Sequence, residues 1–236
     1  MKNLEVILDA QGALIGKVVD YNQEIDRLLH LDFTTNNIEL SDEILIDTPL
    51  YSSWVEKKLA GAKARYGIGG YSEHRNIYKR SEHFTTTEEA RRLHLGIDIW
   101  GEVGTPVYNF YKAKVHSFAN NDHFGDYGAT IILEYCIEGL TFYGLYGHLD
   151  AASLVDLNVG KIISMGEQFA KFGAEKENGF WPPHLHFQLI LDLDNYNGDY
   201  PGVCKYNERE QYLANCPNPE IILRHSFGDV SKTFYS

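Results

Sequence analysis

Hydrophobic and polar residues alternate along much of the middle of the chain, in short runs bounded by glycine and asparagine. A period of two is typical of β-strands that bury one face. The clearest case is the pair of runs at 130–135 and 140–145, which flank Glu138-Gly139 and predict a hairpin. The same pattern predicts two short strands within 106–118, a second hairpin over 161–172 around Met165-Gly166, and a final strand that ends at Leu193.

The first 84 residues show a more mixed pattern. Residues 4–8 and 14–19 predict two strands joined by a turn at Gln11-Gly12. Thr48-Pro49 is a typical helix start, and apolar residues at helical spacing follow it, so a helix is expected over about 49–65. The chain is therefore predicted to be mostly β, with an N-terminal extension that contains a helix.

The segment 66–84 is rich in glycine, tyrosine and arginine but contains neither Gly-x-Gly-x-x-Gly nor a phosphate-binding loop. One hypothesis is that it folds over a functional site, with Tyr71, Arg75 or Arg80 contacting substrate. The alternative is a surface connection whose arginines pair with the excess acids. The expected organisation is an N-terminal extension (1–84), a central domain (85–193) and an irregular C-terminal wrap (194–236).

Composition limits the function classes. The 236 residues are 44% hydrophobic and carry a formal net charge of −12, which argues against a nucleic-acid partner because phosphate binding needs a basic face. No run of about 18 apolar residues predicts a membrane span. No signal peptide is visible, so a cytoplasmic protein is expected, although export by another route stays open. Of three cysteines, Cys136 is expected in the core, and pairing of Cys204 with Cys216 is left open.

Four histidines and one aspartate stand out as candidate metal ligands: His94, Asp98, His148, His184 and His186. His184 and His186 are two apart, so on a strand they share a face, roughly 7 Å apart along the chain. His94 and Asp98 would lie about 13 Å apart on a straight strand. The chain must therefore bend at Gly96 if both bind one ion. These spacings suggest His94, Asp98 and one member of the His184/His186 pair as ligands, which leaves a fourth position for water.

The order His-x-x-x-Asp, Tyr-x-His-Leu and His-Leu-His-Phe resembles the lysostaphin/LytM family of zinc metallopeptidases. The resemblance covers about residues 94–190 and extends to the intervening segments Gly104-Thr105-Pro106-Val107, Gly160-Lys161, Gly166-Glu167, Gly173 and Pro183-His184. It implies the family's antiparallel sheet core, a duplicated hybrid motif. It also implies one Zn²⁺ ion on His94, Asp98 and His186, with His148 and His184 as the unligated active-site histidines. The tract at 66–84 resembles the segment before the peptidase-like part of bacterial proteins that join kinase-like, peptidase-like and aminotransferase domains.

The resemblance implies a zinc-dependent endopeptidase in which metal-activated water attacks a peptide bond, with glycine-containing or cell-wall-derived peptides as substrates. No His-Glu-x-x-His motif supplies a glutamate base, so His148 and His184 are the candidates for base and oxyanion stabiliser. Trp181 is the aromatic residue expected to line the substrate cleft. Two rival functions remain: a non-catalytic regulatory or binding module on the same fold, and a phosphocarrier domain of the sugar transport system, which has its own His-x-Gly-Ile-Asp.

Overall fold

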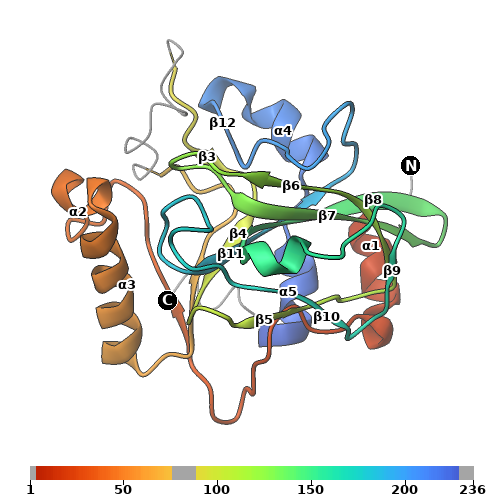
Figure 1. Ribbon diagram of the computed structural model, residues 1–236, viewed down its shortest axis with the longest axis horizontal. Helices are drawn as coiled ribbons and strands as arrows, with labels where there is room; N and C mark the ends of the chain where they lie inside the picture. Colours follow the sequence, from red (N-terminus) through yellow and green to blue (C-terminus); the bar gives the residue numbers. More distant parts are fainter. Residues whose placement is uncertain (1–3, 76–88, 229–236) are drawn as a thin grey trace.

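A computed structural model describes residues 4–75 and 89–228 of the chain (Figure 1). Its centre is an eight-stranded sheet in which β1 and β2 are parallel and all other neighbours are antiparallel. Across the sheet the strands are β1 (Leu28–His30), β2 (Tyr66–Gly69), β4 (Ile97–Trp100), β11 (His184–Ile190), β8 (Leu140–Leu149), β7 (Gly128–Ile137), β6 (Ala113–Asn121) and β9 (Ile162–Ile163).

Two small antiparallel pairs complete the strands: β10 (Gln168–Lys171) with β5 (Pro106–Tyr108), and β12 (Val203–Cys204) with β3 (Leu93–His94). The helices are α1 (Leu4–Ala10), α2 (Asp42–Ile46), α3 (Thr48–Ala62), α4 (Arg209–Asn215) and α5 (Glu220–Phe227), with 3-10 turns η1 (Gly12–Leu14), η4 (Ala151–Leu154) and η5 (Tyr206–Glu208). The predicted mostly β class, with a helix in the N-terminal extension, is confirmed.

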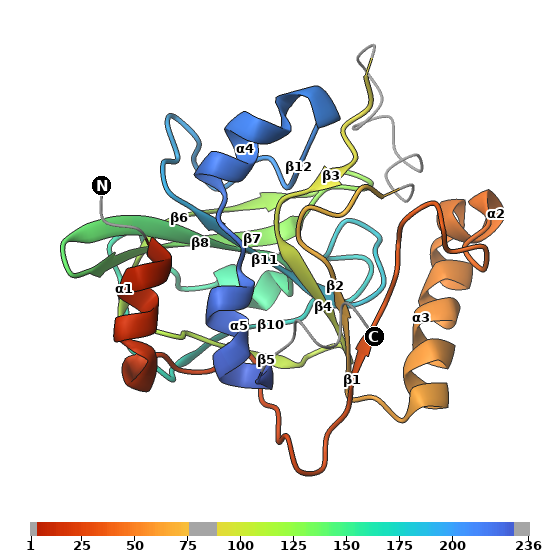
Figure 2. The same ribbon diagram turned by 180° about the vertical axis from the view of Figure 1, so that it is seen from behind.

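Alternation along the strands sends side chains to two different faces of the sheet. One face is apolar, and α1 and α5 lie against it, as Figure 2 shows. Leu8 of α1 and Leu223 of α5 join Leu185 and Phe187 of β11 in one buried cluster. The first and last described helices thus close the same side of the molecule.

The opposite face carries the polar residues of the same strands. Asp98 on β4 is directly across from His186 on β11, and His184 is across from Trp100. Trp100 packs there with Phe33 in a second buried cluster beside α3. A third buried cluster joins this face to the C-terminal segment through Tyr200 and other residues.

Several expected elements differ from the observed ones. Residues 4–10 form α1 rather than a strand, because Leu4, Ile7 and Leu8 lie at helical spacing and are buried together. Residues 14–19 contain no strand in the described structure. The strands expected as a second hairpin exist, but β9 pairs with β6 and β10 with β5.

The helix α3 begins close to the predicted start. Asp47, rather than Thr48, is the N-cap, and its carboxylate accepts the Leu50 backbone N–H at 2.8 Å. Pro49 occupies the first turn as predicted, since its missing N–H would have no partner inside the helix.

The C-terminal segment is more regular than expected, because it contains β12, α4 and α5. Cys136 is exposed on β7 rather than in the core, whereas Cys204 and Cys216 are buried and free. Among the described residues, no helix is both long and apolar enough to cross a membrane.

Candidate metal centre

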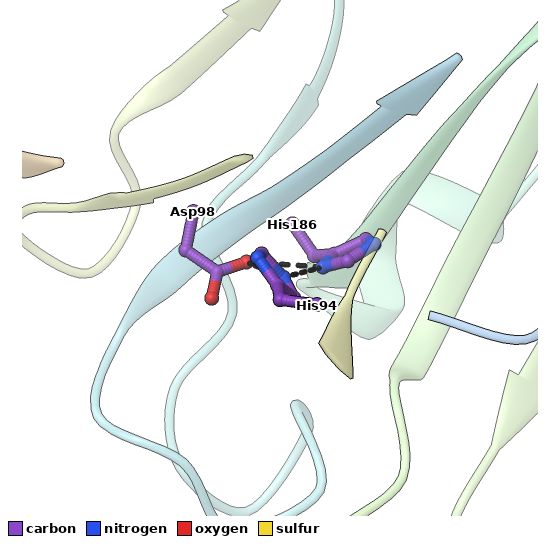
Figure 3. A group of neighbouring side chains, drawn as sticks. All are labelled: His94, Asp98 and His186. Carbon is purple, nitrogen blue, oxygen red and sulfur yellow. Dashed lines mark hydrogen bonds and ion pairs between the residues drawn. The ribbon is translucent and has the colours of Figure 1, made fainter. Parts of the chain in front are cut away.

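Three side chains from two distant parts of the chain converge on one point, as Figure 3 shows. His94 Nε2 lies 3.0 Å from His186 Nδ1, and Asp98 Oδ1 lies 3.0 Å from His186 Nδ1 and 3.3 Å from His94 Nε2. All three residues are buried. The convergence expected from the sequence is therefore present.

The backbone explains how the residues meet. The chain bends at Gly96, between β3 and β4, which brings Asp98 back toward His94. A Cβ at Gly96 would come within 2.8 Å of the His186 ring, so only glycine fits beside it. His184 and His186 share the site face of β11, while Leu185 and Phe187 lie in the core on the other face, both as predicted.

Hydrogen bonds to the outer ring nitrogens fix the tautomers of the two candidate ligand histidines. His94 Nδ1 lies 3.0 Å from the Gly70 carbonyl oxygen, which can only accept, so Nδ1 carries the proton. His186 Nε2 lies 2.8 Å from Gln188 Oε1. The Gln188 amide nitrogen donates to the Pro201 carbonyl at 3.2 Å, which orients Oε1 toward His186. His186 therefore carries its proton on Nε2.

These tautomers leave three electron-pair donors facing one another with no proton between them: His94 Nε2, His186 Nδ1 and Asp98 Oδ1. Burial lowers the pKa of His94 to about 4, and the Arg75 guanidinium adds to this, so the ring is neutral at pH 7. Burial works to raise the pKa of Asp98, but His94 and Arg75 hold it well below its usual range. Two imidazole nitrogens and a carboxylate oxygen arranged in this way fit a divalent cation, and zinc accepts this donor set.

His148 and His184 lie beside this group, with ring centroids 4.1 Å apart. His148 Nδ1 donates to the Asn178 carbonyl at 2.8 Å, and His184 Nδ1 donates to the Pro182 carbonyl at 2.7 Å. In neutral imidazoles this leaves both Nε2 atoms as proton acceptors. Burial lowers the pKa of His184 to about 4 and that of His148 well below its usual range, where the neighbouring His184 adds to the effect.

His148 reaches the site because its backbone departs from the strand pattern. Gly147 pairs with His186, so regular alternation along β8 would send His148 to the apolar face with Tyr146. Its φ of 61° lies in the left-handed region, and the side chain turns toward His184 instead. A strained conformation of this kind at a candidate catalytic residue is a feature of functional sites.

A cavity of about 190 Å³ opens onto the group and is lined by Asp98, His148, His184 and His186. Trp181 also lines it, and its indole N–H donates to the Asp126 carbonyl at 3.2 Å, while the expected contact of Trp181 with substrate stays a prediction. Tyr127 covers another wall, with its ring centroid 5.2 Å from that of His186.

The three residues of the 66–84 tract that were expected near substrate have different positions. Arg75 lines the cavity. Tyr71 is not among the described residues that line it. Its ring packs against the buried cluster that contains Leu185 and Phe187, and its hydroxyl donates to the Cys216 carbonyl. Arg80 lies outside the described residues, so its predicted role stays a prediction.

Sequence reasoning missed the groups that orient the histidines. Gln188 had a readable signal, because it follows His186 by two residues on the same strand face. Asn178 had none: its side chain is buried and bonds the Gly173 and Trp181 carbonyls, which shapes the loop whose carbonyl holds His148. The Gly70 carbonyl is a backbone group that a residue of any type would supply, so the sequence could not identify it.

Comparison with known proteins places this geometry in context. Residues 92–198 match the model of peptidase family M23, and all five site residues fall inside that segment. Among solved structures, the catalytic domain of the antimicrobial peptidase lysostaphin from Staphylococcus simulans is 19% identical, with 70% of this chain and 98% of that chain covered and a TM-score of 0.40.

Two further structures are similar. A zinc-containing peptidase from Vibrio cholerae is 26% identical, with 42% of this chain and 27% of that chain covered and a TM-score of 0.34. A putative peptidase M23 from Pseudomonas aeruginosa is 21% identical, with 55% and 43% covered and a TM-score of 0.36. The match therefore spans under half the length of these two proteins. No curated protein matches the sequence.

Proposed function

We propose that this protein is a zinc-dependent peptidase whose single Zn²⁺ is held by His94, Asp98 and His186. The observation that carries the proposal is the convergence of three proton-free donors, set by the Gly70 and Gln188 contacts, in a segment that matches a peptidase family. Three protein ligands leave room for water, which is the pattern of catalytic rather than structural zinc sites.

The bound zinc would polarise the substrate carbonyl and activate water for attack on it. His148 and His184 are the side chains that would transfer protons in the reaction. Both histidines line the cavity, and each keeps its Nε2 unprotonated, so either can accept the proton that the attacking water loses. The carbonyls of Asn178 and Pro182 hold the Nδ1 protons and stabilise the ring once it becomes charged. The protonated histidine would next donate to the leaving amine or to the developing oxyanion.

The substrate would be a peptide cut at an internal bond. Glycine-containing or cell-wall-derived peptides are the first class to test, since the sequence resemblance implies them. The cavity favours a slender segment at the bond to be cut, because the site residues that line it, Asp98, His148, His184 and His186, are each no more than 6% exposed.

A digestion experiment tests the proposal. A peptide library would be incubated with zinc-loaded protein and with chelated protein, and products identified by mass spectrometry. Cleavage is expected only with zinc. Asp98→Ala is expected to lose zinc and cleavage together, and His184→Ala to keep zinc but lose cleavage. His123→Ala, which changes an exposed histidine, is the matched control and should cleave as the parent does.

The outcomes separate the alternatives. Zinc binding without cleavage of any peptide would favour the non-catalytic module. Failure to bind zinc, together with phosphate uptake from a phosphocarrier protein, would favour the phosphocarrier function. The relation of residues 66–84 to the kinase-like and aminotransferase fusion proteins stays a prediction, as do the division of the chain into three segments and the cytoplasmic location.

A further inference from the structure

Arg75 is a buried arginine that belongs to the N-terminal extension but reaches the metal centre. Its side chain is 2% exposed. Nη1 donates to Asp98 Oδ2 at 2.5 Å, and Nε donates to Glu73 Oε2 at 2.5 Å. Arg75 lies outside residues 92–198, the segment that matches the peptidase family.

The surroundings fix the position of this guanidinium. It lies 5.2 Å from the Phe33 ring centroid and 5.8 Å from that of Trp100. A Cβ on Gly69 would come within 2.7 Å of both the guanidinium and the Trp100 ring, so the absence of a side chain there makes room for them. Because the guanidinium is planar and its donors have fixed directions, two carboxylates and two rings leave it little freedom.

The contact with Arg75 gives the two oxygens of the Asp98 carboxylate different partners. Oδ1 faces the histidine nitrogens, while Oδ2 accepts from Arg75. The same stretch of chain also orients His94, since the Gly70 carbonyl accepts its Nδ1 proton and the Glu73 carbonyl accepts its backbone N–H. Residues 69–75 therefore contact two of the three proposed ligands.

We propose that Arg75 is a positioning residue that confines Asp98 to a single ligating oxygen and so keeps one coordination position open for water and substrate. This inference rests on the proposed metal site. It assigns the N-terminal extension a direct part in that site, so that the segment matched by the peptidase family is incomplete without it.

The Glu73 carboxylate explains how the positively charged Arg75 side chain can lie so close to the proposed zinc site. Its side chain is 8% exposed, and its carboxylate compensates the charge of Arg75, so the pair adds little net charge beside the ion. Removal of Arg75 alone would leave Glu73 uncompensated, and the extra negative charge would itself attract a metal ion. A test of positioning must therefore remove both charges at once.

The test compares the parent protein with the charge-matched double variant Glu73→Gln/Arg75→Met and with Arg75→Lys, which keeps the charge but lacks the two-point fork. Each protein is loaded with Co²⁺ in place of zinc, and its visible absorption spectrum is recorded, because four-coordinate Co²⁺ absorbs more strongly than five- or six-coordinate Co²⁺. Zinc affinity is measured by competition with a chromophoric chelator, and circular dichroism reports folding.

The parent is expected to give the intense four-coordinate spectrum. In the double variant Oδ2 is released and can also ligate, so the absorption should weaken, and zinc affinity should fall about 10- to 100-fold. Arg75→Lys should give an intermediate spectrum, and it decides the question if the double variant does not fold. A parent-like spectrum in the folded variants would overturn the proposal and leave Arg75 a structural residue. A parent that binds no metal would instead overturn the proposed function.

Discussion

Each of the four histidines at the centre donates a hydrogen bond from one ring nitrogen to a protein oxygen, which leaves the other ring nitrogen available to a metal ion or a proton. Gln188 illustrates how much depends on a single contact, because its amide oxygen alone assigns the proton of His186 to Nε2. Without that acceptor the proton can move to Nδ1, the atom that faces His94 and Asp98, and metal binding must then displace it.

Gln188→Leu is therefore expected to weaken zinc binding about 10- to 100-fold. Gln188→Glu keeps an acceptor facing His186 and should retain affinity closer to the parent value. Competition titration with a chelator measures both, and parent-like affinity in the folded leucine variant would contradict the assigned role.

Burial of neutral histidines also makes stability depend on pH. The pKa values of His94 and His184 are about 4 in the folded protein, below the ordinary value of 6.5. The unfolded chain takes up protons at these residues below pH 6.5, whereas the fold resists them until about pH 4. The stabilisation is thus fully present above pH 6.5 and is lost as the pH falls from 6.5 to 4.

Urea unfolding of the metal-free protein at a series of pH values should show this loss, at about 1.4 kcal/mol per pH unit for each of these histidines, and His148, whose pKa burial also lowers well below its usual range, adds to it. His184→Gln removes one of these contributions and should give a shallower slope. A slope equal to that of the parent would contradict the burial argument for His184.

At the scale of elements, glycine decides how closely β3, β4 and β11 can approach. Gly96→Ala would put a methyl group within 2.8 Å of the His186 ring and of the Phe187 carbonyl. The substitution is expected to destabilise the fold by about 1–3 kcal/mol and to impair zinc binding, because the ring must move.

Gly61→Ala is the control for this change. Gly61 is exposed in α3, and a Cβ there meets nothing within 4 Å, so alanine should stabilise the protein by about 0.5–1 kcal/mol through helix propensity. Urea unfolding and zinc titration of both variants check the pair. Unchanged zinc affinity in Gly96→Ala would show that the contact is tolerated.

The elements nearest the site were also the most predictable from sequence. Strand alternation placed His184 and His186 on one face, and the required bend fell at Gly96. The N-terminal elements were not predictable in the same way. Residues 4–8 are too few to separate a strand from a helix, and only packing of Leu4, Ile7 and Leu8 under the sheet decides it. The left-handed backbone at His148 likewise has no sequence signal in a strand.

At the scale of the whole molecule, the two ends of the described chain close the face of the sheet that is opposite the candidate site. The helices α1 and α5 lie side by side there (Figure 2), and Leu8 and Leu223 are fully buried with strand residues of the central sheet. The helices at both ends of the described chain are therefore part of one core with the central sheet, and their loss would expose apolar sheet surface.

Leu8→Ala tests this arrangement. The substitution removes a fully buried side chain and should lower the free energy of unfolding by about 2–5 kcal/mol. Val6→Ala in the same helix is the matched control, since Val6 is 64% exposed and its truncation should cost less than about 0.5 kcal/mol. Because α1 lies on the face away from His94 and His186, zinc affinity of the folded variants should equal that of the parent. Equal stability of the two variants would mean that α1 does not anchor the core, and a selective loss of zinc affinity would mean that the two faces are coupled.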